Sequence, residues 1–445
     1  MRRHLCDHPT MRRPRTASSG RSARLAVLAV AFLVAGCGST TPSGAASSAP
    51  SGSPSPTIQL YSPGPSATPE DPAAVYARIE DQVQTIRGLT AASVLDPVVL
   101  DAPALEAVLR EQFTRDNPPA LVAATQRVDR ALGLIPADAS LQDLELQLLS
   151  GQVIGFYDPK TKKMSVKSVS GGLGVIEQIT FAHEYDHALQ DQHFDLTKLG
   201  TDAPDQGDRS LARLSLAEGD ATILMSDWAQ TALTAVQLLQ YLQESNVSSQ
   251  TATLDKFPAA LKAQLLFPYT SGVTFVQGLE NKGGWEAVNQ AYGQPPDSTE
   301  QILHPEKYVA REEPIKVTIP ADLATRLGGG WSVDFQDTFG EFGLRTWLQD
   351  AGGLDPTVAS AAADGWGGDR VVLVSHGDSF AIAMQTVWDT ADDATAFAAA
   401  AQTTRARLAG STALIDPGTT NRVTVFVASD SATITRLAAA LGLAG

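Results

Sequence analysis

The sequence contains very little cysteine, and its N-terminal apolar run is short. Its 445 residues include two cysteines, Cys6 and Cys37, and neither is placed to form a disulfide. A folded core would therefore depend on side-chain packing rather than on cross-links. The apolar run, residues 25–33, is shorter than the roughly 20 residues that a membrane-spanning helix needs. We therefore do not expect this run to span a bilayer.

Basic residues are also few in comparison with acidic residues. Lysine and arginine together number 33, against 49 aspartates and glutamates, and the formal net charge is −16. Residues 1–36 contribute +6 to this total through seven arginines and one aspartate, which leaves −22 for the rest of the chain. Nucleic acids and anionic membrane surfaces attract basic proteins. The charge therefore argues against nucleic acid as a partner and against a basic membrane-binding face.

Residues 1–36 have the pattern of an export signal, with an arginine-rich start, an apolar stretch and then small residues. The segment Val34-Ala35-Gly36-Cys37 resembles a bacterial lipobox, in which the cysteine becomes the lipid-modified N-terminus after cleavage. An ordinary export signal with an incidental cysteine is the alternative. We expect 1–36 to be a lipoprotein signal peptide. Lipid on Cys37 would then anchor the mature chain in the cell membrane, on its extracytoplasmic face.

The composition changes after this signal. Residues 37–72 are rich in serine, proline and glycine and cannot bury enough apolar surface to fold, which predicts a disordered tether. Helical periodicity follows, and two short strands at 153–157 and 164–167 interrupt it. The expected helices lie at 74–88, 103–115 and 119–133, from Ser140 onward, at 175–192, from about Ser210 onward, at 266–282 and at 285–292.

The pattern changes again after about residue 330, where short strands alternate with alanine-rich helices. The expected strands are 371–374, 380–383 and 423–427, and the expected helices are 391–408 and 431–443. We therefore predict an α+β fold in two parts. A mainly helical domain with a small β-hairpin would occupy 73–330, and a smaller α+β module would occupy 331–445.

The most informative motif is His183-Glu184-Tyr185-Asp186-His187, which has the HExxH spacing. On a helix, positions i and i+4 lie on one face, so the two imidazoles can bind a single Zn²⁺. Glu184 can then reach a water molecule held by the metal. The expected strand hairpin leads directly into this helix, which is a suitable setting for such a site.

The third ligand decides the class of site, because a catalytic zinc has three protein ligands and an open position. His193 has the metzincin spacing from His187, but that scheme needs a helix break at Gln190. A continuous helix would place His193 about 9 Å along the axis from His187, which is out of reach. Glu218 is the better candidate, because a cation would compensate the burial of its carboxylate. A glutamate bonded to the backbone or to Arg213 is the alternative. The apolar helix stripe around Glu218 consists of Leu211, Leu214, Ala221 and Met225.

With these residues the chain resembles the gluzincins, metallopeptidases that carry HExxH on one helix and a ligand glutamate on a following helix. It is most similar to uncharacterised exported bacterial members of that group. The resemblance rests on residues 183–187, 217–221 and 269–276, and it extends over about 150–310. It implies a zincin-like fold and a bound Zn²⁺. It also implies peptide-bond hydrolysis by a zinc-activated water, with Glu184 as general base.

One departure concerns the separation of the ligands. Glu218 follows His187 by 31 residues, which is longer than in thermolysin-like enzymes. The polar loop expected at 196–208 can absorb the excess. The resemblance is therefore to the architecture of the group.

Metal-bound histidines usually donate their other ring N–H to an oxygen, which orients the ring. Asp220 is a candidate for this supporting role, although a solvated helix residue is an equally good interpretation. Asp186 and Asp191 are weaker candidates.

A developing oxyanion needs a hydrogen-bond donor in addition to the metal. His304, Tyr269 and Tyr308 are the candidates, and we place His304 first. A capped helix end explains His304 nearly as well. His376 lies in an expected turn, and we assign it no chemistry.

These observations predict a membrane-anchored, extracytoplasmic zinc metallopeptidase that acts on a protein or peptide. The strand 153–157 could bind an extended peptide at an open edge, or could be a plain structural hairpin. The alternative is a catalytically inactive cell-surface binding or assembly lipoprotein that retains a zincin-like scaffold. The presence of Glu184 favours the enzyme, because an inactive scaffold has no need of a base there.

Overall fold

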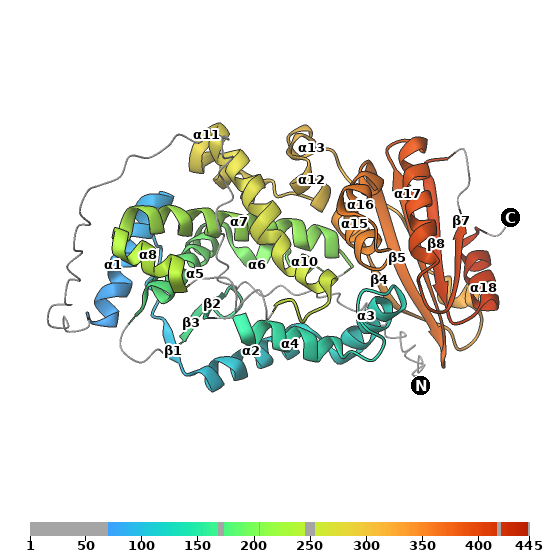
Figure 1. The fold of residues 1–445 in the computed structure, drawn as a ribbon, viewed down its shortest axis with the longest axis horizontal. Coiled ribbons are helices and arrows are strands. Elements are labelled where there is room, and N and C mark those ends of the chain that lie inside the picture. The colour runs from blue at the N-terminus through green and yellow to red at the C-terminus, as the bar shows by residue number, and fades with distance from the viewer. Residues whose placement is uncertain are drawn as a thin grey trace, which may run out of the picture.

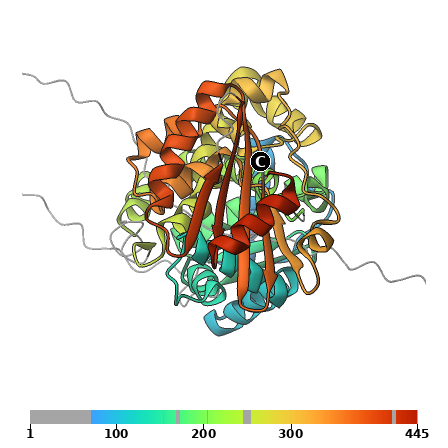
Figure 2. The same cartoon turned by 90° about the vertical axis from the view of Figure 1, so that its right-hand side faces the viewer.

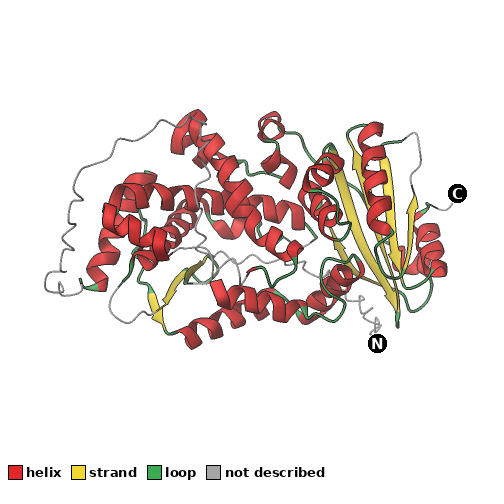
Figure 3. Ribbon diagram, viewed as in Figure 1, coloured by secondary structure: helices red, strands yellow, loops and turns green. Residues whose placement is uncertain are grey.

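The computed structural model describes residues 70–152, 154–167, 173–203, 205–244, 254–415 and 420–443. The expected signal peptide, Cys37 and the tether up to residue 69 lie outside these ranges. Within them the protein is an α+β structure in which helices predominate, as predicted (Figure 3). None of the described helices is both long and apolar enough to cross a membrane.

Helices make up most of the described chain before residue 330 (Figure 1). The longer ones are α1 (Pro72–Arg87), α2 (Ala102–Asp116), α3 (Pro119–Ala131), α4 (Leu141–Gln152), α5 (Val175–Phe194), α7 (Gly207–Ala232), α8 (Ala235–Glu244), α10 (Ala259–Phe267) and α11 (Val273–Gly293). The shorter ones are α6 (Leu196–Leu199), the π-helix η1 (Pro268–Gly272), α12 (Thr299–Leu303), α13 (Pro305–Ala310) and α14 (Leu323–Leu327). Proline lies in the first turn of α1, α2 and α3, where its missing N–H needs no helical acceptor.

The predicted helices up to residue 192 are confirmed, with ends that differ by at most a few residues. The helix expected over 266–282 is instead divided among the end of α10, η1 and the first part of α11. The expected interruption near residue 283 is present, because Gly283 and Gly284 have non-helical backbone angles. The expected loop 196–208 contains α6, and α8 was not predicted.

The centre of the helical part is the pair α5 and α7, which α1 and α11 cover (Figure 1). α5 is buried on nearly all sides from Ile179 to Asp191, so it lacks the single apolar stripe of a surface helix. Two glycines allow α7 and η1 to approach closely. A Cβ on Gly219 would lie 2.5 Å from the carbonyl oxygen of Gly272, and one on Gly272 would lie 2.4 Å from that of Ser215. Both positions therefore require glycine, and Gly219 directly follows Glu218.

A small sheet lies against α5. Its strand order is β1 (Val98–Leu100), β3 (Lys163–Lys167) and β2 (Gly155–Asp158). β2 and β3 form the predicted antiparallel hairpin, and β1 adds a short parallel strand that was not predicted. β2 is therefore an edge strand, and it is the strand with the more extensive contact to α5.

The C-terminal part is a five-stranded antiparallel sheet with helices on both faces (Figure 2). Its strand order is β4 (Ser332–Asp337), β5 (Trp366–His376), β6 (Ser379–Trp388), β8 (Arg422–Ala428) and β7 (Ser411–Ile415). Val371 and Leu373 face one layer while Val372 and Val374 face the other, so the middle of β5 is apolar on both faces. The layers consist of α15 (Gly340–Asp350), α16 (Pro356–Ala363) and α17 (Ala391–Arg405) on one face, and of α14 and α18 (Ser431–Leu441) on the other.

The helical part and the C-terminal part both contribute residues to one apolar cluster. Leu121 and Val128 of α3 pack in the same cluster as Trp347 of α15 and Phe335 of β4. The indole N–H of Trp347 also donates a hydrogen bond to the carbonyl oxygen of Leu132, at 3.2 Å. A helix from the first half of the chain is thus part of the layer that covers the sheet.

Candidate metal site

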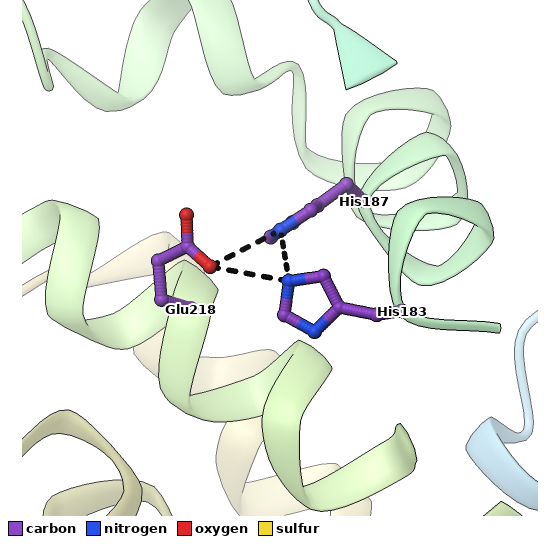
Figure 4. Close-up of side chains that lie close together, drawn as sticks. All are labelled: His183, His187 and Glu218. Carbon is purple, nitrogen blue, oxygen red and sulfur yellow. Dashed lines mark hydrogen bonds and ion pairs between the residues drawn. The ribbon is translucent and has the colours of Figure 1, made fainter. Parts of the chain in front are cut away.

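Three potential ligand atoms from two helices converge at one point (Figure 4). α5 presents His183 and His187 one turn apart, and α7 brings Glu218 opposite them. The Nε2 atoms of the two histidines are 3.1 Å apart. Glu218 Oε2 lies 3.3 Å from Nε2 of His183 and 3.4 Å from Nε2 of His187. The three distances form a nearly equilateral triangle, which is an arrangement that can hold a metal ion.

All three side chains are buried, with His183 1% exposed and the other two 0% exposed. Burial lowers the pKa of His183. Burial also lowers the pKa of His187, but the charges of Glu218 and Glu184 and the contacts with Glu218 and Gln190 together outweigh this effect and raise that pKa to about 10. Burial raises the pKa of Glu218, but the charges of His187 and His183 and the close contacts with both rings together outweigh it and bring that pKa to about 2. The carboxylate is therefore ionised and His187 carries a proton when no metal is present.

The carboxylate of Glu218 has no hydrogen-bond donor. Neither of its oxygens accepts a hydrogen bond from any residue that the structure describes, and the contacts to the two histidines are ion-pair contacts. Burial of a carboxylate without donors is unfavourable by several kcal/mol unless a cation compensates it. Without metal, the protonated His187 supplies that cation, and a metal ion at the centre of the triangle would take its place.

Glu184 lies beside this triangle and touches the edge strand. Its Oε2 accepts a hydrogen bond of 2.9 Å from the backbone N–H of Tyr157 in β2. Its Oε1 is buried and has no hydrogen-bond partner among the described residues. Burial raises the pKa of Glu184 to about 8. A carboxyl group with a pKa in this range can both accept and return a proton near neutral pH.

Gln190 is the residue that the structure places against the outer nitrogen of His187. Its Oε1 lies 2.9 Å from Nδ1 of His187. Its Nε2 donates to Oδ2 of Asp186 at 2.8 Å and to the carbonyl oxygen of Ala217 at 3.1 Å. Gln190 is 0% exposed and connects α5 with α7 one residue before Glu218.

We expected Asp220 to orient a metal-binding histidine, but its carboxylate bonds other residues. It accepts two hydrogen bonds of 2.9 Å from the Arg87 guanidinium and one of 2.7 Å from the Tyr292 hydroxyl. Arg87 also lies 3.8 Å from Asp186 and 4.5 Å from the ring centre of Trp285. Asp220 thus holds α1 and α11 to α7, because the buried cation of Arg87 needs a carboxylate partner. No local pattern predicts this pairing, because 133 residues separate Arg87 from Asp220.

The alternative third ligand, His193, lies at the end of α5 and does not join the triangle. Its Nε2 is 2.8 Å from the carbonyl oxygen of Thr90. α5 continues through Gln190 without a break, which is the condition under which His193 was expected to be out of reach. Asp191, a weaker candidate for orienting a histidine, instead accepts from the Tyr157 hydroxyl at 2.6 Å and from Lys162 at 2.7 Å. Asp191 therefore links α5 to the β-hairpin through hydrogen bonds.

The contacts of two of the three candidate oxyanion donors place them away from the triangle. His304, our first choice, forms an ion pair with Glu341 at 3.0 Å near the C-terminal sheet, and its other acidic neighbours are Glu306 and Asp364. The Tyr308 hydroxyl donates to the carbonyl oxygen of Gln294 at 3.0 Å. Tyr269 is the candidate that lies near the triangle, with its ring centre 6.4 Å from that of His183. Its position on the π-helix η1 could not be foreseen from helical periodicity.

Two further groups in the described chain have acids or histidines close enough to hold a metal ion. One is His304 with Glu341 and Asp364, and the other is Glu300 with Glu312 and Asp389. Both contain exposed carboxylates, in contrast to the triangle. Lys307 forms ion pairs with all three acids of the second group, so a cation is already present there.

The triangle is closed to solvent, so a molecule from solution can reach it only after the surrounding residues have moved. A cleft of about 620 Å³ lies elsewhere, between residues 313–319 and the start of β5. Its charged lining includes Arg209, which pairs with Asp297, and Arg370, which donates to the carbonyl oxygen of Asp205.

Comparison with known proteins gives one match. A family model described as a domain of unknown function (DUF8575) matches residues 329–440, which contain the five-stranded sheet and nearly all of α18. No curated protein and no solved structure gives a significant match to the chain. The residues that form the triangle lie outside the matched segment.

Proposed function

We propose that the protein is a zinc-dependent metallopeptidase in which His183, His187 and Glu218 bind the metal. The observation that carries this proposal is the triangle of ligand atoms, with sides of 3.1, 3.3 and 3.4 Å. Tetrahedral zinc with ligands at about 2.0–2.1 Å requires ligand atoms roughly 3.3 Å apart. The donor set, two imidazoles and one carboxylate, is also typical of catalytic zinc. It leaves one of the four positions open.

The reaction would use zinc chemistry together with one base from the chain. A bound zinc ion acts as a Lewis acid, which makes a water molecule acidic and polarises a peptide carbonyl. Glu184 would take a proton from the water and pass it to the leaving amine. Its free Oε1 and its pKa of about 8 suit both steps. Tyr269 is our candidate for the donor that stabilises the developing oxyanion, because its ring lies nearest to His183 among the three candidates.

The substrate would be a protein or peptide that binds in extended form along β2. An edge strand offers unpaired backbone groups to such a segment. The backbone N–H of Tyr157 in β2 donates a hydrogen bond to Glu184, so the free edge of β2 lies within hydrogen-bond distance of the proposed base. β2 is buried, so a peptide would pair with it only after what covers the strand has moved, and it would then pass the catalytic group.

We further propose that the protein is a lipoprotein anchored on the extracytoplasmic face of the cell membrane. The support is the lipobox-like segment that ends at Cys37, with the serine- and proline-rich residues after it as a spacer. Cys37→Ser would abolish incorporation of labelled fatty acid and release the protein from the membrane fraction. Unchanged labelling of the variant would contradict the anchor and leave the zinc site untouched.

A protease assay with a matched variant tests the enzymatic proposal. The purified full chain is loaded with zinc and incubated with a mixed peptide library, beside Glu184→Gln. We expect cleavage by the wild type and a decrease of about 10²- to 10⁴-fold in the variant, since general-base catalysis contributes that much. Zinc content should be equal in both proteins, because Glu184 is not a ligand. Equal and negligible cleavage by both would favour the alternative, an inactive binding or assembly lipoprotein on a zincin-like scaffold.

A further inference from the structure

The buried amide of Gln190 has three polar neighbours, and their chemistry differs. The Ala217 carbonyl can only accept a hydrogen bond, so it requires the NH₂ group on its side, and Oδ2 of Asp186 is an acceptor on that same side. The third is Nδ1 of His187, which can donate or accept according to the tautomer. The amide NH₂ supplies two donors and the amide oxygen supplies acceptor capacity.

One orientation of this amide satisfies all three neighbours. The NH₂ group must face the two acceptors, so the oxygen faces Nδ1 of His187. The reverse orientation would leave two oxygens opposite the amide oxygen without a donor, inside a region that is 0% exposed. Nδ1 of His187 must therefore carry a hydrogen and donate it to Gln190 Oε1.

This hydrogen decides which nitrogen of His187 is available to a metal. With Nδ1 protonated, the lone pair of the neutral ring lies on Nε2, the atom that points to His183 and Glu218. The same amide bonds the carbonyl oxygen of Ala217, which directly precedes Glu218. One side chain thus contacts a ligand on α5 and the backbone beside a ligand on α7.

We propose that Gln190 is a positioning residue that fixes the metal-binding tautomer of His187 and the distance between α5 and the Glu218 segment of α7. Asp186 and the Ala217 carbonyl hold the amide in place, and Arg87 lies behind Asp186 at 3.8 Å. This inference rests on the proposed zinc site. Asp220, which we expected to orient a histidine, belongs to the outer part of this network through Arg87.

Gln190→Met is the informative variant, because methionine retains the approximate volume and removes every hydrogen bond of the amide. Gln178→Met is the matched control, since Gln178 also lies on α5 and donates one hydrogen bond, to the carbonyl oxygen of Leu173. Zinc affinity is measured on the full chain by competition with a chelator. Loss of an outer partner of a metal-bound histidine typically weakens metal binding by about 10- to 100-fold. We expect a decrease of this size for Gln190→Met and a change below about twofold for Gln178→Met.

The visible spectrum of the cobalt-substituted protein separates positioning from general stability. Displacement of His187 or Glu218 changes the coordination geometry, so Gln190→Met should alter the cobalt bands while Gln178→Met should not. An unchanged zinc affinity and an unchanged cobalt spectrum in Gln190→Met would overturn the inference. Absence of zinc from the wild type would instead overturn the proposed function, so the two failures are distinguishable.

A measurement on the wild type covers the case in which Gln190→Met does not fold. In the zinc-loaded protein with ¹⁵N-labelled histidine, the ring nitrogen shifts report which nitrogen is protonated and which is bound. We expect Nδ1 of His187 to carry the hydrogen and Nε2 to carry the metal. A metal-bound Nδ1 would contradict the proposal, because the Gln190 oxygen could not then accept from it.

Discussion

α7 passes through two buried acidic clusters, and they differ in how their carboxylates are satisfied. Near its start, Asp208, Asp337 and Asp369 form the junction between the helical part and the sheet, and all three are at most 3% exposed. About three turns further along, Glu218 is 0% exposed and faces two imidazoles. Both clusters contain fully or almost fully buried carboxylates.

The junction acids accept hydrogen bonds from the first turns of helices. Asp337 accepts from the backbone N–H of Gly207 at 2.6 Å, at the start of α7. Asp369 accepts from Phe339 and Gly340 at 2.9 and 2.8 Å, at the start of α15. Free N–H groups at a helix start favour a carboxylate there, so these acids have a structural explanation.

Glu218 has no such explanation, since none of the described residues donates a hydrogen bond to its oxygens. The comparison shows that burial of an acid does not by itself indicate a functional site. The informative property is whether local donors satisfy the acid. A variant in one cluster can therefore be compared with a variant in the other.

The largest effect that we expect is a pH dependence of stability at the junction. Burial raises the pKa of Asp208 to about 8, above the ordinary value of 3.8. The folded state therefore keeps a proton that the unfolded chain releases above about pH 4. The free energy of unfolding should fall as pH rises from about 4 to 8, by up to about 1.4 kcal/mol per pH unit.

Asp208→Asn removes this titration and keeps the shape of the neutral side chain. Chemical denaturation of both metal-free proteins at several pH values measures the difference. Wild type should lose stability relative to the variant as pH rises. A constant difference across this range would show that Asp208 has an ordinary pKa in the folded protein.

Gly340→Ala should disrupt the junction by steric overlap. Gly340 has a φ of +71°, and a Cβ there would lie 1.7 Å from Oδ1 of Asp208. Left-handed backbone and overpacking together should lower the free energy of unfolding by about 3 kcal/mol. Thermal or denaturant unfolding measures the loss. Gly377→Ala is the control, because Gly377 has a φ of +60° but open space around its Cβ. Equal losses in both variants would mean that the contact with Asp208 contributes nothing.

Zinc affinity should depend on pH over an unusually wide range. His187 has a pKa of about 10 without metal, so zinc must displace a proton from it at any pH below that value. The apparent affinity should rise about tenfold per pH unit between pH 7 and 8.5, whereas ordinary histidines would give a plateau above about 6.5. Chelator competition at several pH values measures the slope. A plateau above pH 7 would show that His187 is neutral before zinc binds.

The smallest effect expected is on the helix start that Asp337 caps. Asp337→Ala removes the acceptor for the Gly207 N–H, which should lower the free energy of unfolding by about 1–2 kcal/mol. Denaturant unfolding of the metal-free variant and the wild type measures the loss. Equal stability of the two proteins would show that Asp337 does not cap α7.

Local patterns in the sequence predicted the helix of the motif and the hairpin before it. They also singled out Glu218, because a carboxylate within an apolar stripe is visible in one helix. The partners of that site were not predictable, because they depend on long-range packing. Gln190 has no distinctive sequence pattern, and its role follows from its contact with the Ala217 carbonyl on another helix. Arg87 meets Asp220 only because α1 folds onto α7.

Prediction from local sequence patterns was limited in the same way for the residues after 330. β5, β6, β8, α17 and α18 were predicted from their apolar runs. β4, β7, α15 and α16 were not, because β4 and α15 mix polar residues with short apolar pieces and β7 and α16 are short. The order of the strands, with β8 between β6 and β7, is a tertiary property that no local pattern reveals.

The most direct test of the central claim is the zinc content of the purified full chain and of two variants, Glu218→Ala and Asp208→Asn, after dialysis against a weak chelator. We predict close to one zinc per wild-type chain, the same in Asp208→Asn, and a loss of nearly all zinc in Glu218→Ala. Wild-type protein without zinc, or equal zinc in all three proteins, would contradict the assignment of His183, His187 and Glu218 as a zinc site.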